Sequence, residues 1–295
     1  MRWTFVERGF WHPPRRSART LRVRLAAWAE AHGLLLRAAT TPEGVLTADL
    51  ALADGRPFAR LRSRRQCFAA ICIDDLGFSL QTARRVVALP CRLTCAIIPF
   101  TPHARAVAGL AAAHGKEVFI HMPMSSPFRV PEVPEYAIML RPGMDRATIT
   151  SCLDRAFQEV PNAVGLNNHE GSLATEDPTL MALVMEVLKP RNVVFLDSGT
   201  TEKTVAWMAA RDGGLRWMRR NVFLDADPRS LQATEDEFAR LIRLARARGQ
   251  ALAIGHHQFP TTLDVLERRI PEAQKQGVEF VFASALARPA TVTAP

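Results

Sequence analysis

The stretch CFAAICIDD, residues 67–75, decides the fold of this chain. Its apolar residues follow one another without polar alternation and then end in two adjacent acids. Such a run is typical of a strand buried on both faces, as in a parallel sheet that is covered by helices. Active sites of such folds are built at the carboxyl edge of the sheet, so the two acids are candidate functional residues.

The same pattern repeats along the chain. Apolar runs of strand length alternate with segments whose apolar residues recur at helical spacing. The further expected strands are LTCAIIPF (93–100), EVFIH (117–121), NAVGLNN (162–168), NVVFLDSG (192–199), NVFLD (221–225), ALAIGHH (251–257) and VEFVFAS (278–284). This alternation predicts parallel strands joined by crossover helices, in an open doubly wound sheet or a barrel.

The chain is expected to have three parts. Residues 1–17 read as a tail, residues 18–65 as a small Arg-rich appendage and residues 66–290 as the main domain. Within the appendage, apolar residues at helical spacing predict a helix over 19–37, and alternation around the Asp-Gly pair at 54–55 predicts a hairpin. A helix and a hairpin bury too little surface to be stable alone, so we expect a small α+β unit packed on the main domain.

The positive charge is concentrated in the appendage. The formal net charge is +9, and residues 1–65 contain thirteen Arg, no Lys and five acids, which leaves the main body almost neutral. A nucleic-acid-binding domain would carry a basic face on its main body, so no nucleic-acid partner is expected. We interpret the Arg-rich segment as a solvated appendage.

The cysteines and the apolar runs argue against other classes of protein. The five Cys are odd in number, and Cys67, Cys72 and Cys95 lie in or beside apolar strands, which favours buried free thiols over disulfides. No run approaches the roughly 18 apolar residues of a membrane span. The N-terminus also lacks the apolar core of a signal peptide, so the chain as written looks soluble and cytoplasmic. An envelope protein with a missing or misassigned start would have the same pattern, so the compartment stays open.

Polar residues stand at the carboxyl ends of five expected strands. They are Asp74 and Asp75, His121, Asn167 to His169, Asp197 and Ser198, and His256 and His257. Because the loops at that edge converge, we expect these side chains to form one site. A carboxylate and two imidazoles from different strands can hold a divalent ion and leave positions open for water. Alternation along the strand would point Asp74 and Asp75 in opposite directions, which predicts different roles for them.

These motifs resemble those of a known family. AICIDDLG, GKEVFIHMPM, GLNNHEGSLAT, FLDSGT, NVFLD and AIGH followed by TTLDVL occur in the order and approximate spacing of the divergent polysaccharide deacetylases, over about residues 68–285. That family is a branch of the NodB-like carbohydrate esterase fold. The resemblance implies a distorted (β/α) barrel of about seven parallel strands. It also implies a metal-dependent hydrolase that removes N-acetyl groups from a glycan of the periplasm or cell envelope.

The resemblance assigns a metal centre. Asp74 resembles the catalytic base, and Asp75, His121 and His169 resemble the ligands of a divalent ion, for which zinc is the expected metal. In mainstream deacetylases the two ligand histidines sit close together after one strand. Met-Pro-Met-Ser-Ser follows His121 in this chain, so the second imidazole must come from elsewhere, and His169 is the candidate.

The resemblance also assigns the rest of the site. Asp197 corresponds to a carboxylate that tunes His256, and His256 to the acid that protonates the leaving amine. The family usually has Met where this chain has Glu170 and Pro where it has His257. We expect Glu170 to face solvent or to lie behind the ligands. The residues expected to position the substrate or to orient the ligands are Asn167, Asn168, Glu170 and Ser172.

Three alternatives remain open at this point. The chain could be a catalytically silent envelope module that keeps the deacetylase fold and binds a glycan or a partner protein. Two His and one carboxylate also suit a non-haem Fe(II) oxygenase, although an adjacent base-like acid argues against one. A haloacid-dehalogenase-like phosphatase has its two acids separated by one residue, whereas Asp74 and Asp75 are adjacent. The identity of the glycan and the oligomeric state are not specified by the sequence.

Overall fold

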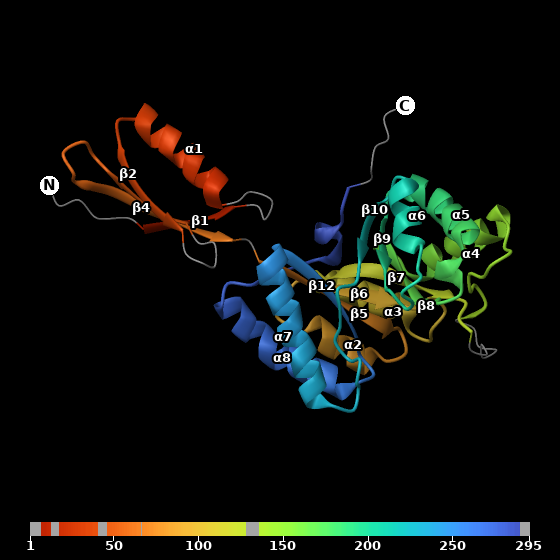
Figure 1. The fold of residues 1–295 in the computed structure, drawn as a ribbon. Helices are drawn as coiled ribbons and strands as arrows, with labels where there is room; N and C mark the ends of the chain where they lie inside the picture. The colour runs from red at the N-terminus through yellow and green to blue at the C-terminus, as the bar shows by residue number, and fades with distance from the viewer. Residues whose placement is uncertain (1–6, 13–17, 41–45, 66, 128–135, 290–295) are drawn as a thin grey trace. The chain divides into compact units, whose positions relative to one another are not determined.

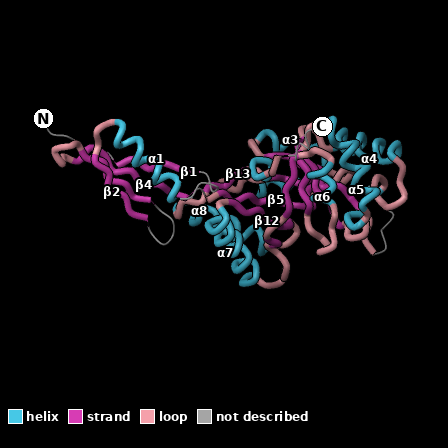
Figure 2. Tube along the Cα trace, turned by 45° about the horizontal axis from the view of Figure 1, so that its top comes forward, coloured by secondary structure: helices cyan, strands magenta, loops and turns pink. Residues whose placement is uncertain are grey.

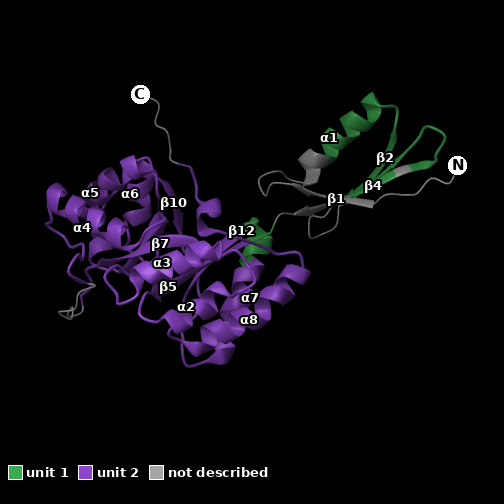
Figure 3. Cartoon of the chain, turned by 180° about the vertical axis from the view of Figure 1, so that it is seen from behind, with its two compact units in different colours: residues 1–68, 244–250 green, residues 69–243, 251–295 purple. Residues whose placement is uncertain are grey.

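The computed structural model describes residues 7–12, 18–40, 46–65, 67–127 and 136–289 of the 295-residue chain. The chain divides into two compact units, which Figure 3 shows in different colours. One unit comprises residues 1–68 and 244–250, and the other comprises residues 69–243 and 251–295. Within the described ranges, no helix combines the length and apolar character that a membrane crossing requires.

The N-terminal unit contains a four-stranded sheet and one helix. Its elements are β1 (Glu7–His12), α1 (Ala18–Ala31), β2 (Leu35–Thr40), β3 (Leu46–Ala51) and β4 (Pro57–Arg65). The strand order is β1-β4-β3-β2, with β1 parallel to β4 and the other neighbours antiparallel. Strands β3 and β4 form the hairpin that the sequence predicts. Strand β1 lies where the sequence predicts only a tail, because its residues pair in register with β4.

Helix α1 ends earlier than the sequence predicts. The expected helix covers 19–37, whereas α1 ends at Ala31 and the chain then enters strand β2. Gly33 adopts a positive φ of 64°, and the N–H of Leu34 donates to the carbonyl of Ala29 at 2.9 Å. This arrangement, with glycine in the left-handed region, stops a helix. The apolar residues beyond it fit helical spacing equally well, so periodicity alone could not place the end.

The larger unit is built on a curled, mostly parallel sheet. Its strands are β5 (Phe68–Leu76), β6 (Thr94–Ile97), β7 (Glu117–Met124), β8 (Ala163–Glu170), β9 (Val194–Asp197), β10 (Arg216–Arg219), β11 (Val222–Phe223), β12 (Gln250–His256) and β13 (Glu279–Val281). The order is β10-β9-β8-β7-β6-β5-β12-β11, and β13 also pairs with β5. Every residue of β6, β7 and β9 is buried, which confirms the two-sided burial that the apolar runs indicate.

Helices connect the strands and lie outside the sheet, as Figures 1 and 2 show. They are α2 (Leu80–Val87), α3 (Ala104–Ala113), α4 (Arg146–Glu159), α5 (Pro178–Leu188), α6 (Ala206–Asp212), α7 (Leu231–Arg248) and α8 (Pro260–Lys275). Several begin or end as the sequence indicates. Asp145 caps α4 by accepting from the N–H of Thr148 at 2.8 Å, and Gly115 follows α3 with a φ of 64°.

The two edges of the sheet are joined by a strand that changes partner. Only Arg220 and Asn221 separate β10 from β11, and these strands run parallel to β9 and β12 respectively. The N–H of Arg220 donates to the carbonyl of Asp197 on β9, and the N–H of Asn221 donates to that of Leu252 on β12. With β10 and β11 taken as one strand, β5 to β9, this strand and β12 form a distorted barrel. The fold class expected from the sequence is therefore confirmed.

Close packing of β7 against β8 generates a stability prediction. Gly165 pairs with Phe119, and a Cβ on Gly165 would lie 2.4 Å from the Phe119 ring. Gly165→Ala should therefore lower the free energy of unfolding by about 1–3 kcal/mol, through overpacking. Chemical denaturation followed by tryptophan fluorescence measures this change.

The matched control is Gly109→Ala on α3, where a Cβ meets no atom within 4 Å. This change should stabilise the helix by up to about 1 kcal/mol. Equal unfolding midpoints for Gly165→Ala and the parent protein would contradict the predicted clash.

Candidate active site

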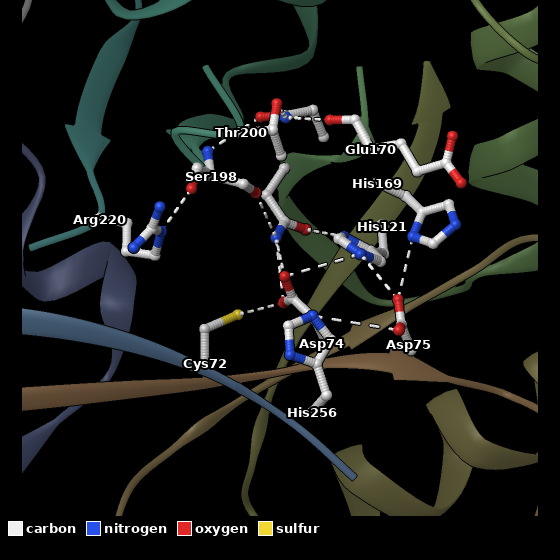
Figure 4. Close-up of polar contacts among 12 residues, drawn as sticks. Cys72, Asp74, Asp75, His121, His169, Glu170, Ser198, Thr200, Arg220 and His256 are labelled. Atoms are coloured by element: carbon white, nitrogen blue, oxygen red, sulfur yellow. Dashed lines mark hydrogen bonds and ion pairs between the residues drawn. The ribbon is translucent and has the colours of Figure 1, made fainter. Parts of the chain in front are cut away.

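The predicted polar residues meet at the carboxyl edge of the curled sheet. Figure 4 shows side chains from the ends of β5, β7, β8 and β12 converging there. Register places them together, because His121 on β7 pairs directly with Asn167 on β8. The expectation of a single site at this edge therefore matches the arrangement of these side chains.

Asp74 and Asp75 both face this site. Simple alternation predicts opposite directions for them, but Asp75 has a positive φ of 60° and the pairing of β5 with β6 shifts register between Ile73 and Leu76. As a result, Nε2 of His121 lies 3.6 Å from Oδ2 of Asp74 and 3.1 Å from Oδ1 of Asp75. The expectation of opposite directions was wrong, because the backbone leaves the extended conformation between the two acids.

Asp75, His121 and His169 form a candidate metal centre. One potential ligand atom from each lies within 4.8 Å of the others. Nε2 of His121 and Nδ1 of His169 stand 3.1 and 3.0 Å from Oδ1 of Asp75. That oxygen is buried and accepts no hydrogen bond from the residues that the structure describes. An unbonded buried carboxylate oxygen is costly, so two nitrogens converging on it fit a shared cation.

The electrostatics of Asp75 favour its charged form. Burial alone would raise the pKa of Asp75, but the His121 and His169 imidazoles outweigh burial and hold that pKa well below its usual range. A metal ligand must be deprotonated, so the carboxylate is prepared for a cation at neutral pH.

Asn167 orients both the candidate base and one ligand. Its Oδ1 lies 2.9 Å from Nδ1 of His121, so it accepts the proton there and leaves the Nε2 lone pair for a metal. Its Nδ2 donates toward both oxygens of Asp74 at 3.0 Å and lies 3.1 Å from the hydroxyl of Ser198. Asn167 is completely buried, so no part of it is exposed to a substrate.

Asn168 is also buried and shapes the loops around the centre. It accepts from the N–H of Ser198 at 2.9 Å and donates to the carbonyl of Glu170 at 2.7 Å. Of the two roles expected for these asparagines, the hydrogen bonds support orienting the ligands. Ser172, in the turn that follows β8, is partly exposed.

His256 is paired with Asp225 and not with Asp197. Nδ1 of His256 lies 2.9 Å from Oδ1 of Asp225, and the hydroxyl of Thr262 donates to the other oxygen of that carboxylate at 2.8 Å. Nε2 of His256 faces the centre, 4.0 Å from Oδ2 of Asp75. Burial would lower the pKa of His256, but Asp225, helped by Asp74 and Asp75, raises it to about 9.

Asp197 instead fixes the loop after β9. It accepts from the N–H of Gly199 at 2.9 Å and from the hydroxyl of Thr204 at 3.0 Å, and its burial raises its pKa. Arg220 supports the same loop by donating to the carbonyls of Ser198 and Gly199. The carboxylate that contacts His256 is therefore that of Asp225 and not that of Asp197. Asp225 ends the NVFLD motif and carries the same strand-end signal as the other candidate residues.

Two residues after β12 hold Asp75 in its left-handed conformation. Nε2 of His257 donates to the backbone carbonyl of Asp75 at 2.7 Å, and the side chain of Gln258 donates to Oδ2 at 2.8 Å. Burial lowers the pKa of His257, which keeps the ring neutral. His257, the second departure from the family pattern, thus supports the backbone of the candidate metal ligand Asp75.

Glu170 is partly exposed and, among the described interactions, makes no direct contact with a candidate metal ligand. Ser126 donates to its Oε2 at 2.7 Å, and the hydroxyl of Tyr136 lies 3.4 Å from its Oε1. The same hydroxyl is 3.1 Å from Nε2 of His169. Of the two expectations for Glu170, the contacts favour a place behind a ligand. Tyr136 lies outside every predicted strand and helix, so no sequence pattern indicated it.

The cysteines match the expectation of buried thiols. All five are free, and every one except Cys91 is buried. The thiol of Cys72 donates to Oδ1 of Asp74 at 3.3 Å, and burial raises the pKa of Cys72 well above its ordinary value. Cys72 is therefore a neutral donor beneath the candidate base.

The fold and the site define a class, namely a (β/α)-barrel protein with a candidate two-histidine, one-carboxylate metal centre at the carboxyl edge of its sheet. A solved structure of an uncharacterised Agrobacterium tumefaciens protein has the same fold, with a TM-score of 0.70 and 23% identity. The alignment covers 79% of this chain and 96% of that one. The family model described as divergent polysaccharide deacetylase matches residues 71–287. The chain belongs to that family.

Two sequence relatives are similar over the same part of the chain. An uncharacterised Haemophilus influenzae protein is 38% identical over 206 residues, which cover 69% of this chain and 72% of the relative. The uncharacterised Escherichia coli protein YibQ is 39% identical over 201 residues, covering 68% and 61% respectively. This chain therefore matches less than two thirds of the Escherichia coli protein.

The pairing of His256 predicts a titration experiment on the metal-free protein. Asp225→Asn removes a carboxylate that raises the pKa of His256 while burial remains, so that pKa should fall from about 9 by one unit or more. NMR titration of the histidine ring nitrogens in chelator-treated protein measures it.

Asp197→Asn is the matched control and should leave the titration of His256 almost unchanged. A larger effect of Asp197→Asn than of Asp225→Asn would show that the pairing is wrong.

The raised pKa of His256 also determines how the stability of the metal-free protein depends on pH. The His256–Asp225 pair stabilises the metal-free protein fully below pH 6.5, and this contribution is lost as the pH rises through about 9.

Proposed function

We propose that this protein is a metal-dependent hydrolase that removes N-acetyl groups from a glycan of the cell envelope. The observation that carries the proposal is the buried, unbonded Oδ1 of Asp75 with two imidazole nitrogens about it and a second carboxylate alongside. Family membership supplies the substrate class, and zinc is the ion that we propose. Three ligands of this type leave coordination positions for water and substrate.

In the proposed reaction, Asp74 and His256 have separate roles. A divalent ion held by Asp75, His121 and His169 would supply Lewis-acid activation of water and of the acetamide carbonyl. Asp74 takes a proton from the attacking water, while Asn167 holds its carboxylate in place. His256, protonated and held at Nδ1 by Asp225, gives a proton from Nε2 to the leaving sugar amine. The N-acetyl amide and water thereby become acetate and a free amine.

The electrostatics of His256 support its role as the acid. Its pKa of about 9 keeps it protonated at neutral pH before the substrate binds. A cation on the neighbouring ligands would lower that pKa toward neutrality, which is the range in which a general acid works best. Asp75 and His256 are held by partly buried hydrogen bonds, so their geometry is formed in advance.

Asp74→Asn separates the base from the metal ligands. The substitution should leave zinc bound at the parental ratio but reduce acetate release about 10²–10⁴-fold, because a positioned base is lost. Elemental analysis and an acetate-release assay on N-acetylated peptidoglycan and chitin oligomers measure the two effects. His169→Ala is the comparison variant and should lose zinc and activity together. Activity of Asp74→Asn within tenfold of the parent would refute the assignment of the base.

Removal of the metal gives a second test. Dialysis against a chelator should abolish acetate release, and zinc at one equivalent should restore it, because the three-residue centre supplies no other source of activated water. Parent protein that binds zinc but releases no acetate from any of these glycans would instead be a glycan-binding module without catalytic activity.

A further inference from the structure

A chain of hydrogen-bonding groups runs outward from the candidate metal centre. Nδ1 of His169 faces Asp75, and Nε2 on the opposite side of the ring is 3.1 Å from the hydroxyl of Tyr136. That hydroxyl is 3.4 Å from Oε1 of Glu170, and Ser126 holds the other oxygen of Glu170 at 2.7 Å. The chain therefore ends on an anchored carboxylate.

The chemistry of a ligand imidazole fixes the direction of these bonds. A histidine that offers Nδ1 to a cation carries its proton on Nε2, so it donates to the Tyr136 oxygen. Tyr136 then has its own proton to give, and Glu170 is the acceptor. The 3.4 Å separation is long for such a bond, and positive charge on the imidazole would strengthen it by polarising each donor in turn.

The backbone at Glu170 supports a role for its side chain. Glu170 has a positive φ of 52° and is followed by Gly171 with a φ of 88°. A left-handed conformation is unfavourable for a residue with a side chain and is found where the surroundings enforce it. Here it turns the chain directly after His169 and brings the Glu170 carboxylate to Ser126 and Tyr136.

We propose that Glu170, acting through Tyr136, is a positioning residue for the metal ligand His169. It fixes the tautomer and ring orientation of His169 and increases its affinity for the cation. The inference rests on the proposed metal centre, and it gives a function to the residue at which this chain departs from its family. Outer partners of ligand histidines typically contribute 10–100-fold to metal affinity.

Zinc affinity of the full chain tests the proposal without reference to activity. Competition with a chromophoric chelator at fixed pH should show affinity about tenfold weaker in Glu170→Gln and in Tyr136→Phe. The double variant should be about as weak as either single one, because both act through one connection. The proposal would be overturned if the losses of zinc affinity in the two single variants multiplied in the double variant. It would also be overturned if either single variant kept the parental affinity.

The matched control is Glu176→Gln. Glu176 is also a partly buried carboxylate that accepts from a hydroxyl, that of Thr201 at 2.6 Å, and it has no contact with the candidate centre among the described interactions. This variant should keep the parental zinc affinity. An equal loss of affinity in Glu176→Gln would show that the effect of Glu170→Gln is only structural, and would count against the proposal.

The single tyrosine of the chain provides a spectroscopic readout. Protein labelled with 3-fluorotyrosine has one ¹⁹F resonance, which should move when zinc is added. The movement should be smaller in Glu170→Gln and absent in His169→Ala. A resonance that zinc leaves unmoved in the parent protein would overturn the connection to Tyr136.

The outcomes distinguish this inference from the proposed function. Parental protein that binds zinc through this connection but releases no acetate would refute the hydrolase and leave the inference standing. If the parent protein releases acetate while Glu170→Gln and Tyr136→Phe bind zinc normally, the hydrolase stands and the inference about Glu170 is refuted.

Discussion

The left-handed backbone at Asp75 is the constraint on which the site depends. An extended strand would send two adjacent carboxylates to opposite faces, whereas a positive φ at Asp75 brings both to one side. This conformation is costly for a residue with a side chain, and hydrogen bonds from His257 and Gln258 help to hold it. One peptide reversal thus converts the end of a strand into two neighbouring acids with separate tasks.

The segment that closes the barrel also supplies Asp225, the carboxylate that pairs with His256. At Arg220 and Asn221 the chain leaves β9 and joins β12, and four residues further on Asp225 reaches His256. The segment that changes partner therefore carries the carboxylate of Asp225 to the histidine at the end of β12, next to the opposite edge of the sheet. This explains why Asp197, which stays with β9, supports a loop and leaves His256 to Asp225.

Apolar runs and their polar ends were sufficient to predict the sheet and the edge at which the polar residues meet, and the family resemblance added the candidate set of Asp75, His121 and His169. They could not predict the direction of Asp74 and Asp75, because alternation assumes unbroken extended backbone. Asp225 had the same strand-end signal as the other site residues, but pairing between strands depends on register, which a sequence does not show. Tyr136 follows no periodic segment, and only the folded chain places it beside His169.

Asn167 couples the orientation of the candidate ligand His121 to that of the candidate base Asp74. Its amide has a direction, with oxygen toward His121 and nitrogen toward Asp74, and only this orientation satisfies both neighbours. Any replacement that lacks either end disturbs a ligand and the base together. His256 and Asp225, by contrast, share no hydrogen bond with Asn167 among the described interactions. On the proposed roles, a descendant of this chain could lose the acid and keep the candidate ligand His121 and the candidate base Asp74 in place, whereas a change at Asn167 would disturb both of these residues at once.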